Sequence, residues 1–365
     1  MTAVPEPPDD SVPSAPAPPR AARILILNRC YPPARTSSAR LARELARTLA
    51  RDGFTVTVIA TGDTTDPETD GAVIIKRLKS IRAPRRFLGL VLLLFRMGLK
   101  ALFAPRPDVI LTLADPPLVH VVGDWVARLR GVRHIHWAIE VQPDLMAVTG
   151  VPLSKRVYAV CERLSRRAMN RADRVIVTGR CMARYLSKNG LDPGRMTLIP
   201  NWPERALTTG GSSMSNGFTM AIVHDDITSA AAQASLVGPV AKFRVLYIGS
   251  VGFAQPIETV LDAATILDTM HPEIEFIFVG PDETHDTVTA EKARRGLSNV
   301  RILPFQPTAR LLEIMESGDV HLMTLKEEAS GLAVPPKFYS ALATARPVIL
   351  VGPTTCEIAR VITDY

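Results

Sequence analysis

Short apolar runs alternate along this chain with longer segments in which apolar residues recur every three or four positions. Runs of the first kind are typical of buried strands, and segments of the second kind are typical of amphipathic helices. Between the strands the pattern predicts helices, among them Ala39 to Arg51, closed by Gly53, and Ile257 to Met270. The predicted strands are Ile24–Leu27, Thr55–Ala60, Val73–Leu78, Val109–Leu113, Val132–Ile139, Arg174–Thr178, Met196–Ile199, Phe243–Ile248, Ile274–Val279, Val300–Leu303, Asp319–Met323 and Pro347–Val351.

Alternating strands and helices at this spacing predict an α/β fold with parallel sheets and right-handed crossovers. The segment from Thr208 to Val240 interrupts the pattern, because it is rich in Gly, Ser, Ala and Thr and has no sustained period. We therefore expect two Rossmann-like domains, residues 23–203 and 243–365, separated by a linker or insertion at 204–242. A chain of 365 residues is long enough for each domain to bury its own core.

Residues 1–22 are rich in Pro, Ala, Asp and Glu and contain no apolar run, which predicts a disordered tail without a signal peptide. The four cysteines are scattered, with no C-x-x-C pair. They predict neither a disulfide framework nor a zinc site, so a reducing cytoplasm fits best.

Charge is distributed unevenly between the two halves. From Arg20 to Arg205 the chain has 32 Lys and Arg against 15 Asp and Glu, a net +17, whereas from Ala206 to Tyr365 the net charge is −7. Such a field favours an anionic partner, either a lipid surface or a diphosphate-linked acceptor. We do not expect nucleic acid to bind, because no zinc finger, RRM signature or aromatic-interleaved basic run accompanies the charge.

The segment Arg82 to Lys100 combines basic residues with a nine-residue apolar run, Phe87 to Phe95. This run is too short to cross a bilayer, which takes about 20 residues. On a helix Arg85, Arg96 and Lys100 fall on one face, and such a helix suits the interface of an anionic membrane. The alternative is a helix packed in the first core with a solvated basic edge.

Two loops are suited to bind a phosphate. The loop Gly249 to Gln255 joins a predicted strand to a predicted helix, and its glycines allow backbone amides to approach a phosphate closely. At Pro335–Pro336–Lys337 two prolines start a helix, and the lysine stands in its first turn, at the positive end of the helix dipole. Each loop alone is also compatible with an ordinary helix start. Together, at the edge of a parallel sheet, they predict an anion site.

These two loops resemble the donor-binding domain of family 4 glycosyltransferases, which are retaining enzymes of two domains. They are most similar to the bacterial branch that transfers N-acetylamino sugars to lipid-linked acceptors, through GSVGFAQ at Gly249 to Gln255 and VPPKFYSALATARPVI at Val334 to Ile349. The resemblance covers roughly residues 23 to 365. In the first half it rests on Cys30–Pro33, Ala114–Pro117, His136–Gly150, Ala172–Val177 and Ile199–Trp202.

The resemblance implies a GT-B fold, in which two Rossmann-like domains face each other across a cleft. The first domain would bind the acceptor and the second a nucleotide-sugar, for which a UDP-sugar is the expected donor. No metal is obligatory, because amides and cationic side chains stabilise the leaving diphosphate. The implied donor-site residues are Gly249, Ser250, Gly252, Gln255, Gly280, Phe305, Glu328, Pro336, Lys337 and Tyr339, and the implied acceptor-side residues are Tyr31, Arg35, Ser37, Ser38 and Asp115.

Glu140 occupies the place of the family's loop aspartate, so the resemblance implies that it is the catalytic residue. It could position or deprotonate an acceptor. The alternative is a structural role, as a cap or as the ion-pair partner of one of the many arginines. We expect His136 to be a strand residue rather than a base.

The implied function is transfer of a sugar to a lipid-linked or polysaccharide acceptor in cell-surface polysaccharide synthesis. The expected location is the cytoplasm, at the inner face of the cell membrane. In the first acceptor loop, the family's usual glycine pair is replaced by Thr36–Ser37–Ser38. Two further features depart from the family. Its glutamate pair is replaced by Leu332 and Ser340, and its usual C-terminal elements do not follow Tyr365, so we expect the second domain to be incomplete. The alternative function is a non-catalytic relative that binds nucleotide or partners another transferase.

Overall fold

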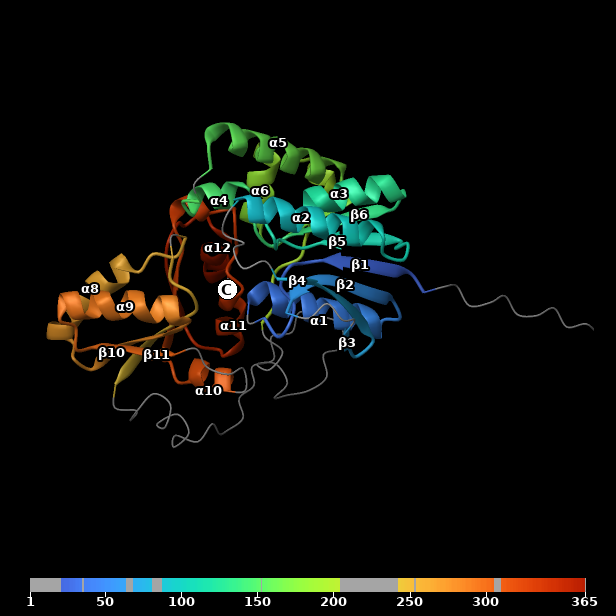
Figure 1. The fold of residues 1–365 in the computed structure, drawn as a ribbon. Coiled ribbons are helices and arrows are strands. Elements are labelled where there is room, and N and C mark those ends of the chain that lie inside the picture. The colour runs from blue at the N-terminus through green and yellow to red at the C-terminus, as the bar shows by residue number, and fades with distance from the viewer. Residues whose placement is uncertain are drawn as a thin grey trace, which may run out of the picture.

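Two sheets organise the chain (Figure 1). The computed structural model describes residues 21–34, 36–63, 68–80, 87–151, 153–203, 242–252, 254–304 and 310–364. Arg35, Phe305, nearly all of the predicted tail and nearly all of the predicted linker therefore lie outside the described residues. The α/β fold with parallel sheets is confirmed.

The first sheet has eight strands in the order β3-β4-β2-β1-β5-β6-β7-β8. Neighbouring strands are parallel except for β3 and β4. The sequence pattern missed β3, which has three residues and no aliphatic side chain. The strands are β1 (Arg23–Leu27), β2 (Thr55–Gly62), β3 (Glu68–Asp70), β4 (Val73–Lys79), β5 (Val109–Thr112), β6 (Arg133–Ala138), β7 (Arg174–Val177) and β8 (Met196–Leu198).

The second sheet has five strands, all parallel, in the order β11-β10-β9-β12-β13. Its first strand, β9, lies at the centre, so the order reverses there and opens a crevice at the carboxyl ends of the strands. The strands are β9 (Phe243–Ile248), β10 (Ile274–Gly280), β11 (Val300–Pro304), β12 (Val320–Thr324) and β13 (Val348–Val351).

Helices cover both faces of the sheets. On the first sheet α1 (Ser37–Arg51) lies on one face, while α2 (Phe87–Leu102), α3 (Val119–Arg130) and α5 (Lys155–Arg171) lie on the other (Figure 1). The remaining helices are α4 (Asp144–Val148), α6 (Arg180–Lys188), α8 (Glu258–Met270), α9 (Asp282–Arg295), α10 (Leu311–Glu316), α11 (Lys337–Ala343) and α12 (Glu357–Asp364), with short 3₁₀ turns η1 (Pro193–Arg195) and η4 (Glu327–Ala329).

The alternation of side chains along β1 separates the two cores of the first sheet. Ile26 packs toward α1, in a cluster that includes Leu41 of that helix. Leu25 and Leu27 point to the opposite face and pack with Met97 of α2. Because successive residues of a strand face opposite sides, this buried strand contributes side chains to the cores on both faces of the sheet.

The helix α2 is packed in the core on one side and exposed on the other. Leu93 and Met97 are buried, whereas Leu88 and Phe95 are exposed. Of the cations predicted to share one face, Arg85 lies outside the described residues, while Arg96 Nη1 donates to Lys79 O at 3.2 Å and Lys100 Nζ donates to Arg77 O at 2.8 Å. They bind main-chain carbonyls of β4 because those groups lie within reach beside the helix. No described helix combines the length and apolarity that crossing a membrane requires.

Three buried histidines connect β6 to the helices above it. His134 Nε2 and His136 Nδ1 lie 3.0 and 3.1 Å from the Thr112 hydroxyl, and His136 stacks on His120 of α3 at 4.4 Å. His136 is thus a strand residue, as expected. Burial, together with the smaller effect of a neighbouring histidine, lowers the pKa of His134 and of His136 to about 3.

We expect this histidine cluster to make the fold sensitive to acid. Between pH 6.5 and about 3 the unfolded chain binds protons that the folded chain does not, so the stability falls as the pH drops below 6.5. Each histidine contributes a slope of up to about 1.4 kcal/mol per pH unit. Urea unfolding at pH 7.5, 6.0 and 5.0 measures it. His136→Asn should flatten the slope and the exposed His285→Gln should not; equal slopes in all three proteins would contradict this explanation.

Candidate functional site

The two sheets meet where main chain from one pairs with main chain from the other. Val141 N donates to Leu332 O at 2.8 Å, and Glu140 forms an antiparallel bridge with Ala333. We call these four residues the seam. Leu332, at one of the positions where the resemblance implies a glutamate, is 2% exposed and packs in a cluster of first-sheet residues. Glu140, the catalytic candidate, is thus bridged to a residue that precedes Lys337 by only four positions.

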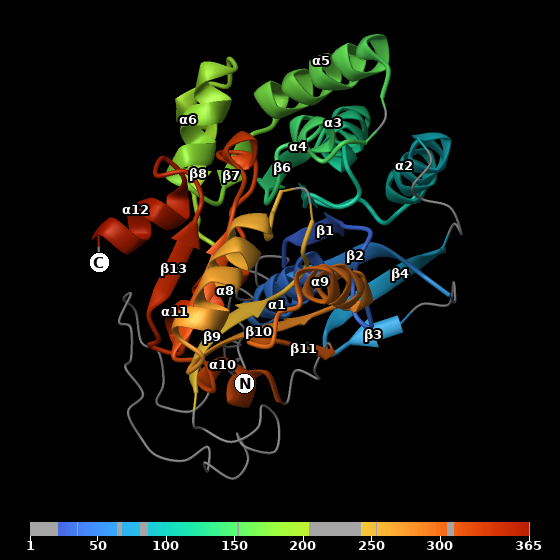
Figure 2. The same ribbon diagram turned by 90° about the vertical axis from the view of Figure 1, so that its left-hand side faces the viewer.

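A second contact reinforces the seam. Glu357, the first residue of α12, accepts from the Arg180 backbone N–H at 2.5 Å and from its guanidinium at 2.9 Å. Asn201 Nδ2 also donates to Val334 O at 3.0 Å. These bonds hold α12 beside α6, as Figure 2 shows. The second sheet is thus attached to the first through buried polar contacts as well as through Leu332.

The glycine loop after β9 is shaped by close backbone approach. Gly249 has φ +120°, a conformation that side chains rarely adopt. Gly280, at the end of β10, lies so close that a Cβ there would stand 2.6 Å from Gly249 O. Thr284 fixes the loop from α9, since its hydroxyl accepts from Val251 N at 2.9 Å. The structure therefore brings Gly249 and Gly280 together, and it adds Thr284, which the sequence analysis missed.

Lys337 lies directly against this loop. A Cβ on Gly249 would stand 3.5 Å from Lys337 Nζ. The ammonium group is 3.9 Å from the centroid of the Tyr247 ring and donates to Gln255 Oε1 at 3.4 Å. No described carboxylate forms an ion pair with it, and desolvation lowers the pKa of Lys337 to about 7. A cation held beside backbone amides without an anionic partner is suited to receive a phosphate.

The other donor-side candidates lie in the glycine loop, at the start of α11 and in η4. Gly252 and Gln255 pair with each other across the loop, and the exposed Ser250 lies in the same loop. Pro336 precedes the first residue of α11. The exposed Glu328 lies in η4, whose preceding residue, Lys326, donates its backbone N–H to Ala254 O.

Tyr339 does not lie with Lys337. The charges that act on its hydroxyl are those of Glu357, Cys181 and Arg180, beside the contact between α6 and α12. Residues two apart on a helix point to nearly opposite sides. The expected donor contact of Tyr339 is therefore not supported, and Tyr247 lies against Lys337 instead.

Glu140 is partly buried beside a second carboxylate. Its Oε2 accepts from Gln142 Nε2 at 3.2 Å, and no arginine of the described chain pairs with it, against the structural alternative. Burial raises the pKa of Glu140; the hydrogen bond from Gln142 lowers it, and the nearby Asp115 carboxylate raises it. Asp115 itself binds Arg29 at 2.9 Å. A carboxyl group whose pKa is raised in this way is suited to exchange a proton.

The acceptor-side candidates do not all face this edge. Tyr31 is 1% exposed, and its hydroxyl donates to Asp70 at 3.0 Å, so its side chain belongs to the core rather than to an acceptor site. Ser37 and Ser38 begin α1, which Thr36 caps by accepting from Ala39 N at 3.2 Å. Ser38 O lies 3.5 Å from Asn28 Nδ2, near the end of β1.

A cleft between the two domains, as the resemblance implies, predicts the principal pocket between Asp115, Glu140, Gly249 and Lys337. The pockets that stand out among the described residues lie elsewhere, on α5, beside α2, and between α2, α3 and α5. The seam closes the space next to Glu140, and the Lys337 side chain occupies the space next to Gly249. Within the described ranges no three His, Cys, Asp or Glu side chains converge into a metal-binding group.

The strain at Gly249 gives a test of the loop geometry. Gly249→Ala should lower the free energy of unfolding by about 1–3 kcal/mol, because its φ is unfavourable and the new Cβ meets Lys337. Gly252→Ala is the matched control: a Cβ there meets nothing within 4 Å, so its effect should stay within about 0.5 kcal/mol. Urea unfolding measures both variants, and equal losses would show that the loop is not as constrained as described.

Comparison with known proteins gives this geometry a context. Residues 37–202 match the model of the glycosyl transferase 4-like domain. The chain is 25% identical over 263 residues, 72% of its length, to the probable glycosyltransferase WbjE of Pseudomonas aeruginosa, and the match spans 61% of that protein.

Two solved structures share the fold. WaaG, a glycosyltransferase involved in lipopolysaccharide biosynthesis, superposes with a TM-score of 0.62 at 15% identity, over 93% of this chain and 84% of that one. HepE of Anabaena, in complex with UDP-glucose, gives 0.61 at 16% identity, over 94% and 89%. Residues 37–202 are thus similar to the glycosyl transferase 4-like domain, and the chain shares its fold with these solved glycosyltransferases.

Proposed function

We propose that this chain is a glycosyltransferase that moves a sugar from a nucleotide diphosphate to a lipid-linked or polysaccharide acceptor. The observation that carries the proposal is the position of Lys337, a desolvated cation with no described acidic partner, against the strained glycine loop at Gly249. Two segments far apart in sequence thus meet at a site that carries positive charge. The site lies at the carboxyl edge of a parallel sheet, where α/β folds bind their ligands.

The donor of this reaction would be a UDP-sugar. Its diphosphate would contact the amides of residues 249–252 and the ammonium group of Lys337, which together stabilise the charge that develops on the leaving group. Because these groups supply the positive charge, we propose that no metal is required. The complex of HepE with UDP-glucose supports the choice of nucleotide.

In the transfer step Glu140 would position or deprotonate the acceptor hydroxyl. Its raised pKa and its place beside Asp115 support this role. We propose a retaining reaction and an N-acetylamino sugar, on the resemblance of Val334 to Ile349 to that branch of the family. The residues that would face the acceptor are Arg29, Asp115, Ser37 and Ser38.

The acceptor would be presented at the inner face of the cell membrane. The net charge of +17 between Arg20 and Arg205 supports attraction to an anionic surface. WaaG, which shares the fold, is named for lipopolysaccharide biosynthesis, in keeping with a role in cell-surface polysaccharides.

One observation favours a second candidate, a non-catalytic protein that binds nucleotide or partners another transferase. Leu332, which stands where the resemblance implies a glutamate, is buried among apolar side chains, and Ser340 is buried as well. Neither can offer a carboxylate to a sugar. A protein that binds UDP but transfers no sugar from any UDP- or GDP-donor would support this candidate.

The donor site predicts metal-independent binding of UDP that depends on Lys337. Lys337→Met should weaken binding by about 1–3 kcal/mol, the scale of a charge-assisted contact. The diphosphate should raise the depressed pKa of Lys337, so binding takes up a proton at pH 8 and the affinity falls as the pH rises above about 7.

Calorimetry in the presence of EDTA measures the affinity for UDP, and repeating it in buffers of different ionisation enthalpy measures the proton uptake. Lys292→Met on α9 is the matched control and should bind UDP like the wild type. Unchanged affinity in Lys337→Met would remove this lysine from the site.

The catalytic assignment predicts that Glu140→Gln lowers turnover by on the order of 10², while the affinity for UDP stays nearly constant. The reason is that Glu140 belongs to the first sheet, whereas the donor loop belongs to the second. A mass-spectrometric assay with UDP-sugars and a polyprenyl-linked acceptor extract measures turnover. Glu162→Gln on α5 is the control, and a fully active Glu140→Gln would exclude proton transfer by this residue.

A further inference from the structure

An apolar groove lies between three helices of the first domain. The helix α3 forms its floor, and α2 and α5 form its walls, as Figure 2 shows for these three helices. Its volume of about 410 Å³ lies within the roughly 300–1,000 Å³ of small-molecule sites. Side chains that line it are Val91, Leu94, Val121, Val122, Val160 and Leu164.

The surface around the groove is also apolar. Leu88, Leu92 and Phe95 on α2 and Trp125 and Leu129 on α3 are exposed large hydrophobic residues. Exposed apolar residues of this size usually occur singly on a soluble protein, whereas a continuous patch marks a binding surface. Two of the three helices that line the groove thus carry further exposed apolar side chains.

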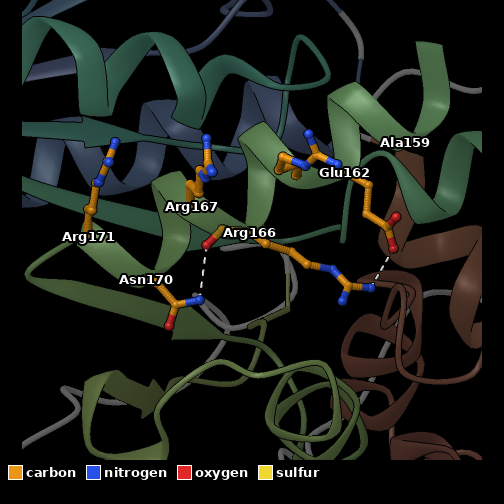
Figure 3. A pocket seen from close by; sticks show the side chains of 7 residues that line it. Ala159, Glu162, Arg166, Arg167, Asn170 and Arg171 are labelled. Carbon is orange, nitrogen blue, oxygen red and sulfur yellow. Dashed lines mark hydrogen bonds and ion pairs between the residues drawn. The ribbon is translucent and has the colours of Figure 1, made fainter. Parts of the chain in front are cut away.

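The wall on α5 adds a row of cations. Arg156 lines the groove, and Lys155, Arg163 and Arg167 are exposed along the same helix. None of the four has a carboxylate partner among the described residues, whereas Arg166 is bound to Glu162 at 2.5 Å. Figure 3 shows Arg167 and Arg171 pointing to the same side of α5, while Arg166 turns toward Glu162.

We propose that this groove binds the hydrocarbon chain of an anionic lipid, with the lipid phosphate held by Arg156 and the neighbouring cations of α5. Chain and phosphate would be bound by adjacent parts of one site, because Arg156 stands at the edge of the apolar lining. This proposal rests on the membrane part of the proposed function and refines it, because it assigns the phosphate contact to the cations of α5.

The pattern fits a lipid better than a protein or a nucleic acid. Helices at a membrane interface combine an apolar face with Lys and Arg on the flanks. A protein partner would need acidic groups for four cations that have no described carboxylate partner, spread along one helix beside an apolar groove. A nucleic acid would leave the apolar groove empty.

Lysophosphatidylglycerol below its micelle concentration tests the site directly, because it offers one chain and one phosphate. Fluorescence of Trp125 should report binding of one molecule per protein, and Trp125→Phe identifies the signal. Lysophosphatidylcholine and glycerol phosphate, which lack the net charge or the chain, should each bind at least about tenfold more weakly.

Variants separate the two parts of the site. Val160→Asp should weaken binding of the lysolipid by about tenfold or more, and Leu164→Asp serves as a second groove variant. Ile266→Asp on α8 is the matched control, since Ile266 is 60% exposed and Val160 53%, and it should have no effect. Arg156→Gln and Arg163→Gln should each weaken binding by about fivefold at low salt, and less at high salt.

Two results would overturn the proposal. One is that neither groove variant, each shown to be folded by thermal unfolding, changes the affinity for the lysolipid. The other is that sedimentation shows a dimer which Val160→Asp dissociates, because a second copy would then be the occupant. The affinity of the same wild-type preparation for UDP reports on the donor site, so either proposal can fail without the other.

Discussion

The arrangement of this molecule depends on a few main-chain contacts between its two sheets. The seam pairs Glu140 and Val141 with Leu332 and Ala333, and the bonds of Glu357 and Asn201 support it. Parallel sheets carry their functional groups at the carboxyl edge. Two such edges can therefore contact one substrate only if the two sheets are held in a fixed relative position. The seam achieves this with backbone groups, which any side-chain sequence can supply.

Leu332 shows how the same position can stabilise the fold at the expense of chemistry. A glutamate there would bury a charge among apolar side chains, at a cost of several kcal/mol unless it were paired. The leucine avoids that cost and strengthens the contact between the sheets. Lys337 lies against the Gly249 loop, and burial lowers its pKa to about 7.

The sequence predicted most of the fold and only part of the site. Strand and helix positions follow from apolar periodicity, which is local, so nearly every strand was found; β3 was missed because Glu68, Thr69 and Asp70 are polar. The convergence of Gly249 with Lys337 was predicted because a loop motif and a sheet edge are both visible in sequence. Side-chain direction is set by tertiary packing. For that reason Tyr31 turned out to be buried and Tyr339 to face α6.

The layered arrangement of the first domain has a further consequence for how substrates arrive. The helices α2, α3 and α5 cover one face of the sheet, so strand axes run along that layer and strand ends open at its side. If these helices bind a membrane, as proposed, the carboxyl edge of the sheet would face sideways along the bilayer surface. An acceptor anchored in the lipid would then reach it by diffusion in two dimensions, while a water-soluble donor would still arrive in three.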